Sequence, residues 1–478
     1  MSFPVAALLC AAGMLVLLIA VSLIRTLMTP SKKSEYVPVP DPPREEKYAG
    51  KLACMVRSET VSVRGTDQRD KFLAFHRELE DLFPLVHEKL EKTEIDGSLL
   101  FFWKGKSGAK PVVLMSHQDV VPAEGEWIHS PFSGDIADGK VWGRGASDTK
   151  CSVMAFFQAA EELLTEGFVP ENDIYLSSSC TEEWGGDGCP KLVNEMKRRG
   201  VKPWIVIDEG GGIISEPMAG IHGNFAMIGV LEKGTGDIRF AARSDGGHAS
   251  APPKNTPIAR LAAFVHYVES HRIFRRKMPA AVAGMFSALA PYASFPLKWI
   301  FGNLWLFRPV LLQVLPAISP AAGAMIRTTV AFTMQSGSDA CNVLPQEASV
   351  CANMRFMPHQ GMKESLAIMG RLAKKFGLTM EVLRATDACR PVDTEGEAFG
   401  FLRAAVENTF PGCPYSPYVM TGATDARFYQ EICDNVFRFA PVIYGPEQMK
   451  GMHGLNENIG TACLPGAVDF YKYIITSN

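Results

Sequence analysis

The chain has 478 residues, more than one ordinary domain holds, so two domains are the natural expectation. Hydrophobic residues make up 47% and charged residues 21%, the balance of a globular protein with a sizeable core. The formal net charge of -3 gives the chain no basic surface, so nucleic acid is not expected as a partner. The 42 glycines and 32 prolines fit a loop-rich α/β enzyme and exclude collagen-like classes.

The N-terminal residues 3–24 form an uncharged apolar run. A helix needs roughly 20 such residues to cross a bilayer, so we expect a single-pass membrane anchor over residues 1–28. A cleaved signal peptide is the alternative, although the run is long for one and no clear small-residue cleavage site follows. Arg25, Lys32 and Lys33 follow the run, which by the positive-inside rule favours a cytoplasmic catalytic part. The side of the membrane stays open at this point.

A Pro-rich, charged segment at residues 29–47 follows the apolar run and is expected to act as a semi-rigid tether. The chain has 11 cysteines without a CxxC pair, and it contains no N-glycosylation sequon. Both features mildly disfavour an oxidising, glycosylating compartment, and neither decides the location.

Strands and helices alternate over residues 48–232, which we expect to be the first part of a catalytic domain. The apolar pattern predicts helices over 68–92, 149–165 and 191–199 and strands over 99–103, 111–115, 173–179 and 203–208. This alternation favours a largely parallel, buried sheet.

The pattern changes at Lys233. Strands with alternating apolar and polar residues are predicted over 235–243 and 350–356, and helices over 256–269 and 363–377. These elements indicate a small α+β domain over residues 233–388, with helices on one face of its sheet. Because the α/β pattern returns over 389–478, the middle segment is expected to be inserted into the catalytic domain.

Residues 273–330 are apolar and aromatic, but prolines break them before any run is long enough to span a membrane. One interpretation is a helical hairpin that covers the core of the small domain. The other is an exposed patch for acyl chains or a membrane surface, with Arg272, Arg275 and Arg276 beside lipid headgroups. The first interpretation is favoured, because long exposed apolar patches are uncommon on soluble domains.

Several residues that can bind metal lie where an apolar strand ends or a Gly-rich loop begins. They are His117, Asp148, Glu182, Glu183, Asp208 and His453. The strand ends of an open α/β sheet are where sites form. Two imidazoles with several carboxylates are a ligand set for a pair of zinc-like ions, with one glutamate left for acid–base work.

The acidic residues beside these ligands suggest separate roles. Asp119 lies two residues after His117 and can accept the imidazole N–H that does not face the metal. Glu182 and Glu183 are adjacent and cannot easily share one role, so one would bind metal while the other acts as general base. Each signal alone is weak, since a histidine after a strand is more often structural and an Asp at a helix start is usually a cap. Because all of these residues occur together and in order, a metal site is favoured over separate structural roles.

Eight segments of the chain carry motifs that match one known family. They are SHQDVVP, GRGASDTK, SSSCTEEWGG, VIDEG, GGHASAPP, NVLP, TGATDAR and MHGLNEN. The chain resembles the metallopeptidase-20 family over about residues 70–475, and within it the carboxypeptidase S, aminoacylase and N-fatty-acyl-amino-acid hydrolase branch. The resemblance implies an α/β di-zinc peptidase catalytic domain with an inserted α+β, ferredoxin-like domain that serves as lid and dimerisation unit.

The resemblance also implies a role for each metal-binding residue. His117 and Asp208 would hold one zinc ion, and Glu183 and His453 would hold the other. Asp148 would bridge the two ions. Co²⁺ or Mn²⁺ would be possible substitutes for Zn²⁺.

Catalytic roles follow from the same resemblance. Asp119 would orient His117, and Glu182 would be the general base. His248 would reach the site from the inserted domain of a partner subunit and stabilise the oxyanion, which implies a homodimer. The pocket for the substrate's carboxylate would be formed by Asn342, Arg355, Thr424 and Arg427. Without the resemblance, Arg355 would be interpreted as a solvated strand charge and Asn342 as a turn residue.

The expected function is hydrolysis of the amide bond of N-acyl amino acids or of the C-terminal peptide bond of small peptides. The substrate would be a small molecule or short peptide with a free carboxylate, and the membrane would be contacted through residues 3–24. A dipeptidase-like Gly-X carboxypeptidase is one alternative, and a membrane-tethered scaffold without catalysis is another. The intact Glu182 argues against the scaffold, because binding alone does not need a base that holds no metal. The anchor and the apolar segment favour N-acyl amino acids slightly over dipeptides.

Overall fold

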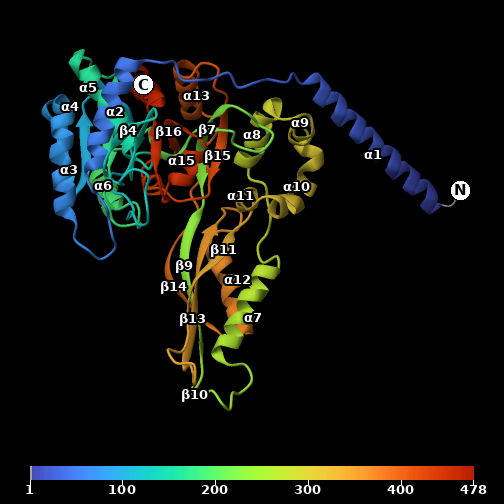
Figure 1. Ribbon diagram of the computed structural model, residues 1–478. Helices are drawn as coiled ribbons and strands as arrows, with labels where there is room; N and C mark the ends of the chain where they lie inside the picture. Colours follow the sequence, from blue (N-terminus) through green and yellow to red (C-terminus); the bar gives the residue numbers. More distant parts are fainter. Residues whose placement is uncertain (1–2) are drawn as a thin grey trace.

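The computed structural model describes residues 3–478 (Figure 1). Its main parts are an eight-stranded sheet, a four-stranded sheet, and an N-terminal helix, α1 (Phe3–Met28), that projects away from both sheets. The chain enters the larger sheet first, passes through the smaller sheet, and returns to the larger one before it ends.

Eight strands form the larger sheet in the order β1-β2-β6-β3-β7-β16-β8-β15. Their bounds are β1 Glu91–Ile95, β2 Ser98–Trp103, β3 Ser107–Met115, β6 Asn172–Ser178, β7 Ile205–Ser215, β8 Asn224–Glu232, β15 Tyr415–Met420 and β16 Val436–Tyr444. The central strands β6, β3, β7 and β16 run parallel to one another. Parallel strands covered on both faces are continuous apolar runs, which is why the sequence identified β3, β6 and β7, whereas no strand was predicted over β16.

Helices cover both faces of this sheet. Val112 and Leu114 of β3 point into a core shared with α2, α5, α13 and α16, while Val113 and Met115 point into an opposite core shared with α6 and α14. The bounds are α2 Pro42–Arg57, α5 Lys150–Thr165, α6 Gly188–Arg198, α13 Glu397–Thr409, α14 Ala426–Tyr429 and α16 Leu464–Ser477. The side-chain period of two along β3 therefore places adjacent residues in separate cores.

The expected tether is shorter than the sequence suggested. Helix α2 begins at Pro42, and the Asp41 side chain caps it by accepting the backbone N–H of Arg44. Residues 42–47 are therefore helical, and α2 packs into the large core.

The helix expected over 68–92 is two helices, α3 (Arg69–Leu82) and α4 (Pro84–Lys89). A proline disfavours helical conformation in the residue before it, and Phe83 indeed leaves the helical region with φ -134° and ψ 63°. The remainder of the expected helix runs into β1.

The four-stranded antiparallel sheet has the order β11-β13-β9-β14. Its strands are β9 Gly234–Arg243, β11 Thr329–Ser336, β13 Glu347–Phe356 and β14 Thr379–Thr386, and its helices are α7 Pro257–Ser270 and α12 Met362–Lys375. Phe264 of α7 and Met369 of α12 pack against Ile238, Phe240 and Val350 in one separate core. The element order β9-α7-β11-β13-α12-β14 is that of a split βαβ, ferredoxin-like unit.

Apart from Ile273, Phe274 and Val330 at its ends, the apolar segment 273–330 does not cover the core of the small sheet, contrary to the favoured interpretation. It forms α8 Ala280–Leu289, α9 Phe295–Gly302, α10 Leu304–Ile318 and α11 Pro320–Ala324. Helix α8 packs against β15, and residues such as Phe286, Phe301 and Leu311 belong to the large core. The small sheet is already covered by α7 and α12, so this segment extends the larger core instead.

Short elements complete the chain. They are β4 Asp135–Ala137, β5 Lys140–Trp142, β10 Gly247–His248, β12 Val343–Leu344, α15 Pro446–Gly451, β17 Asn458–Gly460 and the 3₁₀ turns Ala290–Tyr292 and Thr461–Cys463. Strand β17 pairs with β5, so the loop that carries His453 lies beside the Gly-rich loop that carries Asp148. Residues more than 300 positions apart in sequence are thereby held together.

Candidate active site

Asp148 lies at the centre of a cluster of potential metal ligands. Its Oδ1 lies 3.2 Å from Nε2 of His117, and its Oδ2 lies 3.1 Å from Nε2 of His453. The same His453 nitrogen lies 3.0 Å from Oε2 of Glu183. One ligand atom each from His117, Asp148 and Glu183 falls within 4.8 Å of the others. The two carboxylate oxygens of Asp148 thus face different imidazoles, as a bridging ligand requires.

His453 has an unusual backbone conformation for a residue with a side chain, with φ of 53°. This left-handed region is sparsely populated by non-glycine residues, and such strain gathers at functional sites. The conformation turns the imidazole toward Asp148 and Glu183.

Asp119 contacts His117 differently from the expected arrangement. Nδ1 of His117 lies 2.8 Å from the backbone carbonyl oxygen of Asp119 and 3.5 Å from its carboxylate. The carboxylate instead accepts the backbone N–H groups of Glu182 and Glu183, at 3.1 and 3.2 Å, and the hydroxyl of Ser62 at 2.5 Å. The backbone of Asp119 therefore orients the imidazole, while its carboxylate fixes the turn that carries both glutamates.

Glu457 holds Asp148 in place and was not found from the sequence. One of its oxygens accepts the backbone N–H groups of Ser147 and Asp148, each at 2.9 Å. The other oxygen pairs with the Arg144 guanidinium at 2.7 Å, and both side chains are buried. The arginine in GRGASD and the final acidic residue in HGLNE were the available signals, and neither has metal-ligand spacing.

Asp208 lies beside the cluster but outside the tight group formed by His117, Asp148 and Glu183 among residues 3–478. Its two oxygens accept the backbone N–H groups of Glu209, at 2.9 Å, and of Ala426, at 2.8 Å. Burial raises the pKa of Asp208, and the nearby charge of His117 opposes that shift. Its carboxylate is therefore rigidly held close to His117.

Buried carboxylates crowd this site. Burial, with repulsion from Asp425 and Glu183, raises the pKa of Glu182 well above its ordinary value. Burial likewise raises the pKa of Glu183, and it raises that of Asp425 to about 7. Oε1 of Glu183 is buried and has no hydrogen-bond partner among residues 3–478. Imidazole nitrogens with an unpartnered buried carboxylate oxygen fit divalent cations of the zinc type, whose charge would relieve the repulsion.

Four residues were expected to bind the substrate's carboxylate. Three of them, Arg355, Thr424 and Arg427, lie between the four-stranded sheet and the eight-stranded sheet, around Glu232 at the end of β8. Arg427 lies 3.9 Å from the buried carboxylate of Glu232, which also accepts the hydroxyl of Thr424 at 2.8 Å. Burial lowers the pKa of Arg355, and the charge of Arg427 lowers it further. Nε of Arg427 is buried without a hydrogen-bond partner in the described chain. Two guanidinium groups thus lie close enough together to repel each other.

His248 and Asn342 lie away from the cluster. Strand β10, which contains His248, pairs with β12, and the backbone N–H of Ala249 donates to the carbonyl of Asn342 at 3.0 Å. Both residues are exposed. Figure 1 shows β10 at the end of the four-stranded sheet that is remote from the eight-stranded sheet. A single chain therefore does not bring these two residues to Asp148.

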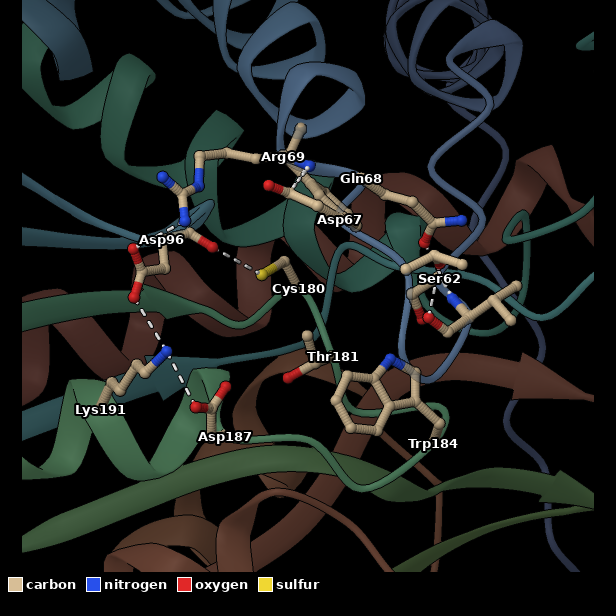
Figure 2. A pocket seen from close by; sticks show the side chains of 13 residues that line it. Ser62, Asp67, Gln68, Arg69, Asp96, Cys180, Thr181, Trp184, Asp187 and Lys191 are labelled. Carbon is tan, nitrogen blue, oxygen red and sulfur yellow. Dashed lines mark hydrogen bonds and ion pairs between the residues drawn. The ribbon is translucent and has the colours of Figure 1, made fainter.

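A polar cavity of about 180 Å³ lies behind the turn that carries the two glutamates (Figure 2). Trp184 and Thr181 form one side of it. Lys191 pairs with Asp96 at 2.8 Å and with Asp187 at 2.9 Å along its edge. No member of the Asp148 cluster lines this cavity, so it backs the turn rather than forming the candidate metal site.

Residues 113–477 match the model of peptidase family M20/M25/M40. The chain belongs to this family. The match spans His117, Asp148, the two glutamates and His453, so the resemblance seen in the sequence is confirmed.

Two curated M20 relatives are similar over nearly their whole length. "N-fatty-acyl-amino acid synthase/hydrolase PM20D1" of Xenopus tropicalis is 33% identical over 97% of this chain and 93% of its own length. "Probable carboxypeptidase S-like 2" of Dictyostelium discoideum is 32% identical over 90% of this chain and 84% of its own length. This M20 chain is therefore an enzyme, a hydrolase of the metallo-carboxypeptidase and N-acyl-amino-acid type.

Solved structures support the same fold. An M20 family metallo-carboxypeptidase from Sulfolobus solfataricus has a TM-score of 0.67 at 16% identity and covers 90% of this chain and 98% of its own. Human carnosine dipeptidase 1 has a TM-score of 0.60 at 16% identity, covering 90% of this chain and 97% of its own. The M20 α/β fold is thus shared with enzymes of distant sequence.

Proposed function

We propose that this M20 hydrolase uses two zinc ions, held by His117 and Asp208 on one side and by Glu183 and His453 on the other, with Asp148 between them. The observation that carries the proposal is the placement of the two oxygens of Asp148 against two different imidazoles. The buried Oε1 of Glu183, which has no hydrogen-bond partner within residues 3–478, adds support. A peptidase from Bacillus subtilis described as dinuclear metal-binding shares the fold, with a TM-score of 0.53.

The two ions, when bound, would polarise the amide carbonyl of the substrate and make water a better nucleophile. Glu182 lies in the same turn as Glu183, and the Asp119 carboxylate fixes the backbone of both. Glu182 removes a proton from the attacking water and returns it to the departing amine. The raised pKa of its carboxyl, caused by burial, suits a group that must both accept and deliver a proton.

The substrate that we propose is an N-acyl amino acid with a free carboxylate. The charge of Arg427 lowers the pKa of the half-buried Arg355, and Nε of Arg427 has no partner in the described chain, which favours binding of an anion. Asn342 and Thr424 would complete the pocket, although the Thr424 hydroxyl already donates to Glu232. The relative that is 33% identical over 97% of this chain is named for fatty-acyl amino acids.

Cleavage of a C-terminal residue from short peptides is the second candidate. The relative from Dictyostelium discoideum, named as carboxypeptidase S-like, is 32% identical. Both reactions break an amide bond next to a residue with a free carboxylate, so they use the same groups in this site.

We further propose that the working form is a homodimer in which the four-stranded sheet of the inserted segment 233–388, with α7 and α12, is a lid and dimerisation unit. Residues 48–232 and 389–478 then form the catalytic domain, and α2 and α8–α11 pack into its core. The exposed position of His248 at the tip of the small sheet supports the homodimer, because it can act on a substrate only in a neighbouring subunit. The partner subunit's His248 would then stabilise the oxyanion. The partner's Asn342, which is held beside it, would reach the same substrate pocket.

We also propose that α1 anchors the enzyme in a membrane. The 22 residues Ala7–Met28 are long and apolar enough to cross a bilayer. A signal sequence would meet the same criterion.

A chain-length series tests the substrate. The full-length protein, purified in detergent with zinc, would be assayed on one amino acid carrying acetyl, octanoyl and oleoyl groups and on Gly-X dipeptides. Each buried CH₂ contributes roughly 0.8 kcal/mol, so kcat/KM should rise steeply with chain length. A flat series with faster cleavage of dipeptides would favour the second candidate.

A further inference from the structure

The last turns of α1 are bound to the apolar helical segment by buried polar side chains. The indole N–H of Trp299 donates to the hydroxyl of Ser22 at 2.8 Å. The side-chain amide of Asn303 donates to the hydroxyl of Thr26 at 2.9 Å and to the carbonyl of Ser22 at 3.2 Å. Ser22, Thr26 and Asn303 are all buried. These four side chains form a specific joint between α1 and α9.

Lys298 completes this joint at the C-terminal end of α1. Its ammonium donates to the carbonyl of Thr29 at 2.5 Å and to the hydroxyl of Ser31 at 2.9 Å. A cation beside the last carbonyls of a helix is favourable both as a hydrogen-bond donor and against the helix dipole. The backbone N–H of Lys32 then donates to the carbonyl of Pro291 at 2.8 Å. The chain leaving α1 is thus fixed to the folded body.

The joint between α1 and α9 lies near the C-terminal end of the part of α1 that would span the bilayer. Before Ser22, between residues 4 and 21, helix α1 is exposed at residues 4, 5, 7–17, 20 and 21 and half-buried at Leu18 and Ile19. At 1.5 Å per residue this stretch is about 27 Å long, close to the roughly 30 Å hydrocarbon core of a membrane. When these residues cross the bilayer, α9 and α10 lie at its surface. Figure 1 shows α9 near the C-terminal end of α1, with α10 below α9.

Helix α10 presents an apolar face that nothing covers in the described chain. Trp305, Val310 and Ile318 are 47%, 57% and 72% exposed, and Val314 lies on the same side of the helix. Phe295 at the start of α9 is also exposed. Residues 310, 314 and 318 follow at intervals of four, which places them in one stripe.

Of the two prolines inside α10, Pro316 frees a backbone carbonyl that another residue satisfies. Pro316 cannot donate to the carbonyl of Leu312, and a carbonyl left unpaired in an apolar medium is costly. The guanidinium of Arg276 donates to that carbonyl at 3.2 Å and to the carbonyl of Gln313 at 3.1 Å. Arg272 lies beside the same Gln313, at 3.4 Å from its side chain. The freed backbone is satisfied, and cationic groups rim the apolar face.

We propose that α9 and α10, joined at an angle of 107°, form a hairpin that lies in the interfacial layer of the bilayer spanned by α1. We propose in addition that α1 is retained and stays bound to this hairpin. The occupant of the exposed stripe is lipid. Apolar side chains enter the acyl boundary, and Arg272, Arg276 and Arg308 meet anionic headgroups. This inference rests on the proposed membrane span, and the experiment separates the two.

The test measures depth in the full-length protein reconstituted into phosphatidylcholine–phosphatidylserine liposomes. Cys10, Cys54 and Cys341, the cysteines that are not buried and not in a strand, are replaced by serine, and a single new cysteine carries an environment-sensitive fluorophore. The three positions are Leu15→Cys in α1, Val314→Cys in α10 and Ile258→Cys in α7 as matched control. Each variant must retain hydrolytic activity, which shows that it is folded.

Quenching by doxyl-labelled lipid and by aqueous iodide then distinguishes the outcomes. The hairpin predicts that Leu15 and Val314 probes are quenched by lipid and shielded from iodide, while the Ile258 probe shows the reverse. A Val314 probe that behaves like the Ile258 probe overturns the hairpin while leaving the span intact. A Val314 probe shielded from both quenchers overturns it as well, because protein such as a second copy would cover the stripe. A Leu15 probe open to iodide overturns the span and the hairpin together.

Retention of α1 has its own test. The intact mass of the protein isolated from membranes should include the residues of α1, because their loss would leave the indole N–H of Trp299 without its acceptor Ser22 and would remove two of the three acceptors of the Asn303 amide. A mature protein that begins after Met28 overturns the inference that α1 is a structural partner.

Discussion

The carboxylate of Glu457 accepts the backbone N–H of Asp148 at 2.9 Å, and this contact joins the two loops on which the candidate metal site depends. Its other oxygen is paired with Arg144. Glu457 lies in the same loop as His453, and it thereby fixes Asp148 between the imidazoles of His117 and His453. The geometry of the site is set by a side chain that touches no substrate.

Glu457→Gln should weaken metal binding, because an amide holds the Asp148 loop less strongly and leaves Arg144 buried without a charge partner. We expect about a 10- to 100-fold loss of metal affinity, the range for groups that support metal ligands. Metal-buffered titration of the apoprotein measures it. Glu161→Gln is the matched control, since Glu161 is also largely buried and also accepts backbone N–H groups, from Leu85 and Val86. Equal affinities in the two variants would contradict the role of Glu457.

Glu232→Gln should destabilise the protein, because it leaves the Arg438 guanidinium fully buried with no counter-charge. Breaking one side of a buried ion pair costs about 3–5 kcal/mol. The double variant with Arg438→Met should recover part of this loss. Thermal unfolding measures both. Glu347→Gln, which breaks partly exposed pairs with Arg239 and Arg243, should have an effect of about 0–1 kcal/mol. A Glu232→Gln protein as stable as that control would contradict the prediction.

Those parts of the fold with a strong local pattern were predictable from the sequence. The run PVVLM gave β3, and the apolar face of residues 149–165 gave α5. His117, Asp148 and Glu183 were predictable because strand ends and a Gly-rich loop mark them, and the structure brings them within 4.8 Å. Glu457 was not predictable, since its role depends on a pairing of β17 with β5 that no local pattern reveals.

Contacts between residues far apart in sequence explain what the sequence did not reveal. His76 of α3 carries no sequence signal, yet it is buried and contacts Gln118 and Glu94 at 3.0 and 3.2 Å. A buried polar side chain with two polar partners is stable, and periodicity does not detect those partners. The segment 273–330 was expected over the small sheet because long exposed apolar patches are uncommon on soluble domains. The core that it joins is formed by β15, which comes more than 80 residues later.

Asn303→Leu should loosen α1 from α9, because it removes the donor to the Thr26 hydroxyl and the Ser22 carbonyl and leaves the indole N–H of Trp305 without its acceptor. An unmade buried hydrogen bond costs about 1–3 kcal/mol. Trypsin should then cleave faster at Lys32, whose backbone is held against Pro291 in the intact joint. Asn408→Leu, on the exposed side of α13, serves as control. Equal cleavage rates in the two variants would show that the joint is weak.

Mixing His248→Ala subunits with Glu182→Gln subunits should restore activity that neither variant has alone. After exchange, half of the dimers are mixed and one site in each combines an intact Glu182 with an intact His248. The recovered rate should approach about a quarter of the wild-type rate for a symmetric dimer. Subunit exchange is followed by fluorescence transfer between labelled chains. Exchange without recovery would place His248 outside the working site.

Separate roles for the adjacent glutamates are the central claim, and one paired measurement tests it most directly. Metal content and kcat are determined for Glu182→Gln and Glu183→Gln, prepared with excess zinc and then desalted. The account predicts that Glu182→Gln keeps two ions per chain while kcat falls by about 10² or more, and that Glu183→Gln loses an ion. Loss of metal from Glu182→Gln with full retention by Glu183→Gln would contradict the assignment and reverse the two roles.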